Sequence, residues 1–142
     1  MELKDTVGYM ISSTSRRLNQ QLQQLFQDYD VSPEQWSLLI SLDEQDGITH
    51  KDLAQRTEKD PANLTRLVDQ LEGKSLVKRA ANPNDRRSQL VCITDQGRKT
   101  ARTLAPIEAA FVGRLLQGTT DEEIESFKRF MAKINHNAKQ QA

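Results

Sequence analysis

The fold is decided by residues 60–97, which read DPANLTRLVDQLEGKSLVKRAANPNDRRSQLVCITDQG. The pair Asp60-Pro61 is a helix-start signal, because aspartate accepts hydrogen bonds from free N–H groups and proline suits the first helical position. Apolar residues then recur at steps of three and four, the spacing of one helix face. They are Leu64, Leu67, Val68 and Leu71. The stretch therefore begins with a helix that buries one side.

A β-hairpin is predicted after that helix. Residues 76–77 and 89–93 have the composition of strands, and they flank a polar loop at 81–88 that contains Asn, Pro and Asp. Thr94-Asp95 then caps another helix, which we expect to run through Leu115 and Leu116. Within it, Pro106 predicts a kink or a local break.

Two short helices precede this stretch. Ser32-Pro33-Glu34-Gln35 is a capping box with proline at the first helical position, and it opens a helix that carries Trp36, Leu39 and Ile40. Thr49 caps a brief helix that ends near Arg56 or Thr57. The brief helix after Thr49, a tight turn, the helix that Asp60-Pro61 starts and then the hairpin follow one another in the order of a winged helix-turn-helix. The predicted fold is therefore mostly α with a small β-hairpin wing.

Long amphipathic helices are predicted at both ends of the chain. One runs from about Leu3 to Tyr29 and would be roughly 40 Å long, more than the core of one domain needs. A capping box at Thr120–Glu123 opens the other. We expect these N- and C-terminal dimerisation helices to pair two chains through exposed apolar stripes. The stripes consist of Val7, Met10, Leu18 and Phe26 at one end and Ile124, Phe127, Met131 and Ile134 at the other.

Length and composition exclude several classes of protein. A chain of 142 residues with 36% hydrophobic residues is expected to form one folding unit. No apolar run exceeds four residues, so we expect neither a membrane span nor a signal peptide, and a cytoplasmic location. One cysteine and two histidines do not form a metal-ligand pattern. The sequence also has no catalytic motif, and we expect no enzyme activity, metal or cofactor.

The net charge of zero hides an uneven distribution. Residues 1–73 hold 13 acidic and seven basic side chains, whereas residues 74–102 hold eight basic and two acidic ones. A solvated basic face and a nucleic-acid surface both fit this pattern.

The helix after Asp60 has the chemistry of a DNA-recognition helix on its outward face. Arginine pairs with guanine, asparagine and glutamine pair with adenine, and small methyl groups touch the thymine methyl. Asp69 on this face is mildly adverse to phosphate. The candidate DNA-binding residues are Pro61, Ala62, Asn63, Thr65, Arg66 and Gln70.

The hairpin loop places Asp85, Arg86 and Arg87 at its tip, where a thin projection can enter a minor groove and meet its negative potential. Asp85 can orient one guanidinium through a bidentate pair. Phosphate contacts position a protein on DNA without reading its sequence. The candidates for them are Lys51, Lys59, Lys74, Lys78 and Arg79.

The chain resembles the MarR family of bacterial winged-helix regulators over nearly its whole length. The resemblance rests on residues 53–54, 64–72, 76–79, 85–87 and 93–97. It implies one MarR-type domain at 1–142, with a winged helix-turn-helix lobe at 32–97 and dimerisation helices at 1–30 and 98–142. By this resemblance, Asp85 holds the position of the acidic residue that orients the Arg87 side chain. Ser75 departs from the family, which usually has glycine there, and Gly73 is expected to supply the flexibility instead.

The resemblance also implies how the protein works. A homodimer places each recognition helix in a major groove of double-stranded DNA and represses transcription from an inverted-repeat operator. A small aromatic or phenolic ligand then releases it by binding between the dimer helices and the lobe. The residues expected to line that effector pocket are Tyr9, Ser13, Arg17, Trp36 and Leu39.

Two alternatives remain open. A winged-helix module can bind another protein and have no affinity for DNA, and the acidic first half of the chain is compatible with this. A second branch of the family senses oxidants through a cysteine in its first helix. This chain has none there, and Cys92 in the predicted strand 89–93 is the only candidate for a redox sensor.

Overall fold

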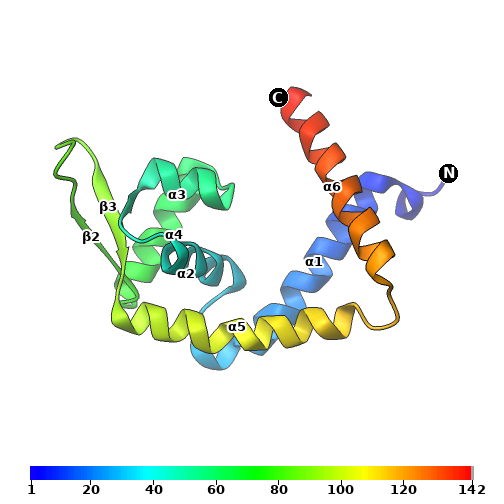
Figure 1. Ribbon diagram of the computed structural model, residues 1–142, viewed down its shortest axis with the longest axis horizontal. Coiled ribbons are helices and arrows are strands. Elements are labelled where there is room, and N and C mark those ends of the chain that lie inside the picture. The colour runs from blue at the N-terminus through cyan, green and yellow to red at the C-terminus, as the bar shows by residue number, and fades with distance from the viewer. Residues whose placement is uncertain (142) are drawn as a thin grey trace. The chain divides into compact units, whose positions relative to one another are not determined.

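The computed structural model describes residues 1–141, and its elements follow the predicted order (Figure 1). The helices are α1 (Val7–Phe26), α2 (Pro33–Glu44), α3 (His50–Thr57), α4 (Pro61–Gly73), α5 (Asp95–Leu115) and α6 (Asp121–Gln141). The strands are β1 (Ile48–Thr49), β2 (Val77–Ala81) and β3 (Gln89–Ile93). The winged-helix class, mostly helical with a small hairpin, is confirmed.

Residues 1–109 form one compact unit and the described residues from 110 to 141 form a second, with the boundary inside α5. The core of the first unit gathers the apolar faces of α2, α3 and α4, the hairpin and the start of α5. The four apolar residues predicted for α4 are at most 1% exposed. The helical spacing read from the sequence therefore identified the buried face of α4 correctly.

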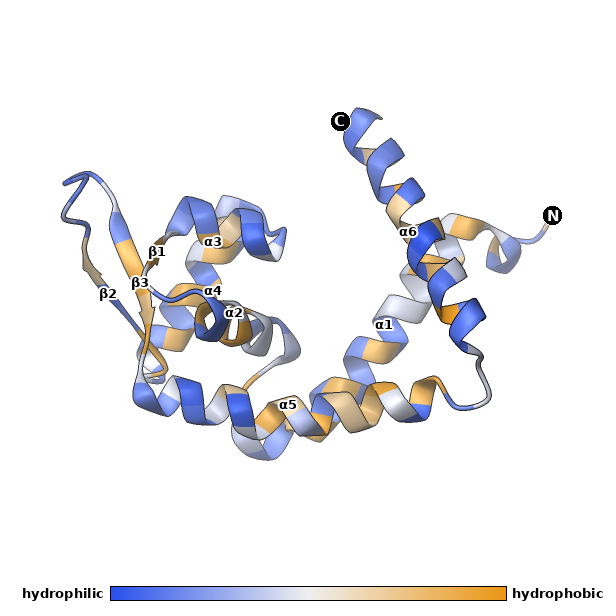
Figure 2. Cartoon of the chain, viewed as in Figure 1, coloured by the Kyte–Doolittle hydropathy of each residue, from blue (hydrophilic) through white to orange (hydrophobic). Residues whose placement is uncertain are grey.

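The small sheet is antiparallel and has the order β1-β3-β2. Val77 pairs with Ile93 and Ala81 with Gln89, so β2 is longer than the predicted segment 76–77. The two-residue strand β1, which the sequence analysis missed, pairs Ile48 with Val91. Figure 1 shows the β2–β3 hairpin as a thin projection, and Figure 2 shows that its tip is hydrophilic. This projection is the wing.

Side-chain caps start the helices where the sequence placed them. Ser32 and Gln35 form the full capping box of α2. Thr49 Oγ1 accepts from the Asp52 N–H at 3.1 Å, and Asp60 Oδ1 accepts from the Asn63 N–H at 2.9 Å. Thr120 and Glu123 form a capping box before α6, in which each side chain accepts a hydrogen bond from the backbone N–H of the other residue. Each cap satisfies backbone donors that the first helical turn leaves free, which fixes the register of the helix.

The end of α4 corrects one expectation. Gly73 is the last helical residue, and Ser75 adopts the left-handed conformation at φ 63°. The Leu76 N–H donates to the Leu71 carbonyl and the Ser75 N–H to the Glu72 carbonyl, both at 3.0 Å. These two bonds form a Schellman motif, which needs a left-handed residue at the Ser75 position. Gly73 therefore does not supply the turn.

Gly97 marks a close approach between α5 and the base of the hairpin. A Cβ atom at Gly97 would lie 2.2 Å from the Leu76 carbonyl oxygen and 2.8 Å from Ile93 Cγ1. The Gly97 N–H donates to Thr94 Oγ1 at 3.0 Å, and this cap fixes the first turn of α5. The helix then continues through Pro106 without a break in its helical residues.

The N-terminal helix is shorter than predicted. Thr6 is extended and accepts from the Tyr9 N–H at 3.4 Å, so residues 3–5 form a separate 3₁₀ turn. A second 3₁₀ turn follows α1 at Gln27–Tyr29. Phe26 is 0% exposed and packs edge-on against Trp36 with ring centroids 5.7 Å apart. It belongs to the core of the first unit rather than to an exposed dimer stripe.

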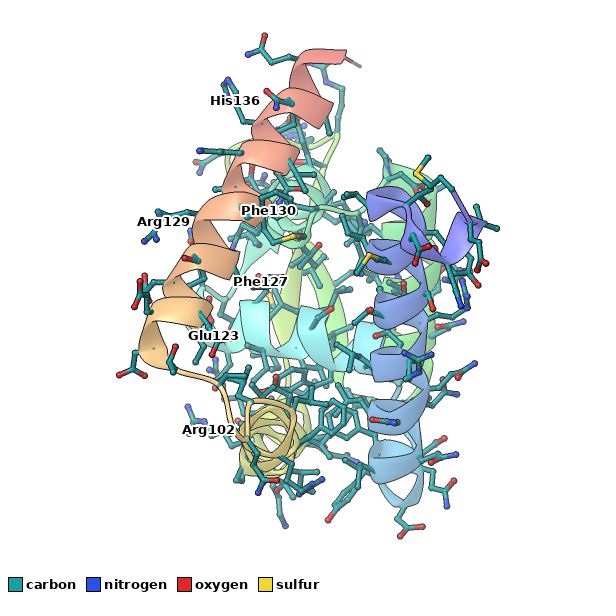
Figure 3. All side chains as sticks on the ribbon, turned by 90° about the vertical axis from the view of Figure 1, so that its right-hand side faces the viewer. Arg102, Glu123, Phe127, Arg129, Phe130 and His136 are labelled. Carbon is teal, nitrogen blue, oxygen red and sulfur yellow. The ribbon has the colours of Figure 1, made fainter. Side chains whose placement is uncertain are left out.

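Apolar side chains remain uncovered on α1, where Val7 and Met10 are each 54% exposed. In the second unit, Phe127 and Phe130 are more than half exposed. Figure 3 shows these two phenylalanines on one side of α6, with Arg129 and His136 on the other. Among residues 1–141 no helix is long and apolar enough to cross a membrane.

Candidate nucleic-acid interface

The outward face of α4 presents polar and small side chains to solvent. Pro61, Ala62, Thr65 and Arg66 are exposed, and Asn63 is half-buried. The Arg66 guanidinium donates to Asn63 Oδ1 and lies 3.8 Å from a carboxylate oxygen of Glu34. The two side chains predicted to read bases are thus already linked to each other, and they can present their donors as one unit.

Gln70 is held from behind by the neighbouring helix. Its Oε1 accepts from Gln35 Nε2 at 2.9 Å, and Gln35 Oε1 accepts from Lys74 Nζ at 3.1 Å. Gln35 is only 6% exposed, so this bond fixes the direction of the Gln70 amide. The Gln70 amide nitrogen keeps its donors, whereas its oxygen already has a partner.

The tip of the wing exposes two arginines. Arg86 and Arg87 are exposed, and the Arg87 side chain is 96% exposed. Asp85 does not hold Arg87 in the expected bidentate pair, because its Oδ1 accepts from the Arg87 backbone N–H at 2.9 Å and lies 3.9 Å from Nε. Asn82 orders the loop through the Asn84 N–H and the Ser88 hydroxyl. Asp85 therefore fixes the backbone of the turn, and it does not hold the Arg87 guanidinium in a bidentate pair.

The arginine at the base of the wing has a different environment. Arg79 Nη1 contacts Glu72 Oε1 and Nη2 contacts Asp69 Oδ1, each at 2.6 Å. Its Nε donates to His50 Nε2 at 3.3 Å. Burial and the charge of Arg79 lower the pKa of His50, which favours the neutral imidazole that accepts this bond. The Arg79 side chain is only 16% exposed.

The remaining candidates for phosphate contacts divide into two groups. Lys51 and Lys78 are exposed, and within residues 1–141 neither makes an ion pair. Lys59 is 14% exposed and lies 3.9 Å from Glu34. Lys74 Nζ donates to the Asp30 carbonyl at 2.5 Å. The ammonium groups of Lys59 and Lys74 thus already have partners within the protein.

A second ionic cluster joins α2 to α5 within the first unit. Asp43 accepts hydrogen bonds from both Arg98 and Arg102 at 3.1 Å, and Asp46 accepts from Arg98 at 2.8 Å. The hydrogen bond from Arg102 is the main reason why the pKa of Asp43 lies below its ordinary value. Asp46 also accepts from the Ile93 N–H at 2.8 Å, so it connects α5 to the wing.

The residues expected to line an effector pocket lie on α1 and α2. Tyr9 and Arg17 are exposed, and Ser13 is half-buried. Trp36 is half-buried, and its indole N–H donates to the Ala101 carbonyl at 3.2 Å. Leu39 is 0% exposed and belongs to the core.

Cys92 is half-buried on β3. Burial is the main reason why the pKa of its thiol is raised, with Asp46 adding to the effect. A raised pKa disfavours the thiolate, which is the form that reacts with oxidants. In the described part of the chain, no group of three or more His, Cys, Asp or Glu side chains is arranged to hold a metal ion.

The partners of these candidate residues were not predicted from the sequence. Glu34 lies near both Arg66 and Lys59, and Gln35 holds Gln70. Asp69 and Glu72 enclose Arg79. The only signal in the sequence was the three-residue spacing of these two carboxylates, which places both within reach of one cation on a helix surface.

Comparison with known proteins supports this assignment of elements. Residues 31–89 match the family model described as MarR family. The HTH-type transcriptional regulator YdgJ of Bacillus subtilis is 32% identical over 107 residues, which cover 75% of this chain and 65% of YdgJ. The HTH-type transcriptional repressor MdtR of Bacillus subtilis is 25% identical, with 94% of this chain and 86% of MdtR covered. The crystal structure of the S. aureus MepR–DNA complex matches with a TM-score of 0.87 at 25% identity, covering 93% of this chain and 98% of that one.

Proposed function

Because this chain belongs to the MarR family of winged helix-turn-helix transcriptional regulators, we propose that it represses transcription by binding a specific sequence of double-stranded DNA. One observation carries the proposal. The wing tip presents Arg86 and Arg87 to solvent, and the neighbouring helix α4 presents Ala62, Thr65 and Arg66. These are the two parts of a winged helix that reach the grooves of DNA.

In this proposal α4 lies in the major groove. Arg66 donates to guanine O6 and N7, the Asn63 amide or the Gln70 amide nitrogen reaches adenine, and the methyl groups of Ala62 and Thr65 touch thymine. Pro61 brings the first turn of α4 close to the DNA. Arg86 and Arg87 enter the adjacent minor groove, with Asp85 shaping the turn that carries them. Lys51 and Lys78 contact phosphates and fix the register of the protein.

The proposed active form is a homodimer. Apolar side chains of α1, and separately of α6, are exposed to solvent, as expected of surfaces that a second chain covers. A two-fold dimer binds an inverted repeat whose half-sites are about 10 base pairs apart. Sedimentation at micromolar concentration is expected to give a dimer, and a monomer would contradict this part of the proposal.

Release from DNA is proposed to follow binding of a small aromatic or phenolic ligand near Tyr9, Ser13 and Arg17. Such a ligand acts by favouring dimers whose recognition helices do not match the groove spacing. The exposed guanidinium of Arg17 and the indole of Trp36 on the neighbouring element supply a cation and an aromatic surface. Phenolic acids that lower DNA affinity for the wild type but not for Arg17→Ala would support this site.

The test of DNA binding is selection of duplexes from a random pool by the purified protein. An Arg86→Ala/Arg87→Ala variant at physiological salt is the control. Enrichment of an inverted repeat by the wild type alone supports the proposal. A folded dimer that enriches no duplex, with and without candidate ligands, would contradict it and favour the protein-interaction module.

A further inference from the structure

Charged side chains from three elements meet where β2 lies against α4. The Arg79 guanidinium contacts Asp69 and Glu72 at 2.6 Å, and its backbone N–H donates to the second oxygen of Glu72 at 3.3 Å. Its remaining nitrogen donates to His50 at the start of α3. One arginine therefore connects the base of the wing to both helices of the helix-turn-helix.

Asp69 lies in the middle of the α4 face that is proposed to contact DNA. Thr65 and Arg66 precede it by four and three residues, so the three side chains share one side of the helix. Asp69 is 62% exposed and Glu72 43%, whereas Arg79 is 16% exposed. The carboxylates thus face outward and the guanidinium lies behind them. A phosphate approaching α4 meets the two carboxylates before it reaches Arg79.

We propose that Arg79 is a positioning residue, which offsets half of the negative charge of the two α4 carboxylates and fixes the wing against this helix without contacting DNA. The proposal rests on the proposed function, because it explains how a helix with Asp69 on its outward face tolerates phosphates. With Arg79 present the three side chains carry a net charge of −1, and without it they carry −2. A basic residue that the sequence assigns to phosphate therefore promotes DNA binding from the interior of the lobe.

The test compares Arg79→Gln in two backgrounds, the wild type and Asp69→Asn/Glu72→Gln. The readouts are the dissociation constant for the selected duplex and its dependence on salt. In the wild type, Arg79→Gln is expected to weaken binding about tenfold, because two bare carboxylates then face the DNA. In the neutral background the same substitution is expected to change affinity less than about twofold and to leave the salt slope unchanged.

Lys78→Gln is the matched control, because Lys78 precedes Arg79 on β2 but points its charge into solvent. It is expected to weaken binding equally in both backgrounds and to reduce the salt slope by about 0.9. Arg79→Lys keeps the charge and is expected to retain most of the affinity. If Arg79→Gln unfolds the lobe, as judged by thermal unfolding, Arg79→Lys and the neutral background still separate the two roles.

The inference is overturned if Arg79→Gln weakens binding as much in the neutral background as in the wild type and also reduces the salt slope there. Arg79 would then be a direct phosphate contact. This failure differs from failure of the proposed function, in which the wild type itself binds no duplex even at low salt.

Discussion

The base and the tip of the wing carry the same residue type in opposite environments. At the base, Arg79 is 16% exposed and contacts two carboxylates at 2.6 Å. At the tip, Arg87 is 96% exposed and its nearest carboxylate oxygen is 3.9 Å away. Both were candidates for DNA contact, because both lie in the segment that holds the excess positive charge. The local charge of a sequence therefore does not separate exposed arginines from arginines that are paired inside the fold.

Packing follows the same division. The base of the hairpin lies against α5 with no room for a methyl group at Gly97, whereas the tip is exposed and hydrophilic (Figure 2). We therefore expect stability to depend mainly on the base of the wing, and direct contacts with DNA to come from the tip and from α4. The following predictions test this division, beginning with the largest effect.

Gly97→Ala is expected to destabilise the protein by about 3 kcal/mol, because the new Cβ must displace the backbone around Leu76. Urea unfolding followed by circular dichroism measures the change. Arg86→Ala at the tip is the control and is expected to shift the free energy of unfolding by less than about 0.5 kcal/mol. Equal effects of the two substitutions would remove the distinction between base and tip.

Arg79→Ala is expected to cost about 1 to 2 kcal/mol of stability, because it leaves the Asp69 and Glu72 carboxylates without their cation. Arg87→Ala is expected to cost almost nothing, since its side chain lies in solvent. The same unfolding measurement decides between them. A larger loss for Arg87→Ala than for Arg79→Ala would reverse the assignment of roles.

Ser75→Gly is expected to stabilise the protein by about 0.5 to 1 kcal/mol. Ser75 has φ 63°, where a side chain is strained and glycine is not, and this gain exceeds the extra entropy of glycine in the unfolded chain. Ser75→Ala keeps the strain and serves as the control. A loss of stability for Ser75→Gly would show that the serine side chain itself stabilises the turn.

The smallest expected effect concerns pH. The folded pKa of His50 lies below its ordinary value of 6.5, so its contribution to stability is full above that pH. The contribution is lost as pH falls through the lower folded pKa. Between about pH 7.5 and about pH 5.5 the wild type should lose more stability than His50→Gln. If both proteins lose the same amount of stability over this pH range, burial and the contact with Arg79 do not lower the pKa of His50 in the folded protein.

Local signals in the sequence predicted most of the fold. The caps at Ser32, Thr49 and Asp60 and the apolar spacing of α4 depend on residues within one or two helical turns, so they could be read directly. Strand β1 could not be predicted, because two residues at 48–49 form a strand only through pairing with Val91. Phe26 was assigned to a dimer stripe because the sequence does not show that Trp36 covers it.

The sequence predicted which residues form the candidate site, but not which of them are exposed for DNA and which are paired within the protein. Arg66, Arg86 and Arg87 were placed on exposed surface by helix periodicity and by the loop, and the structure has them there. The roles of Lys74 and Arg79 depend on carboxylates and carbonyls that only the tertiary fold brings near. Gln70 likewise accepts a hydrogen bond from Gln35, which lies 35 residues earlier in the chain on another helix.

In the proposed mode of binding, the wing tip contacts DNA and the base of the wing positions the tip. The most direct test is the salt dependence of the dissociation constant for the selected duplex, measured for the wild type and for Arg86→Ala/Arg87→Ala. Removing the two tip arginines is expected to weaken binding and to reduce the salt slope by up to about 1.8, at about 0.9 for each lost contact. An unchanged affinity and an unchanged slope would contradict it, because the tip would then lie outside the interface.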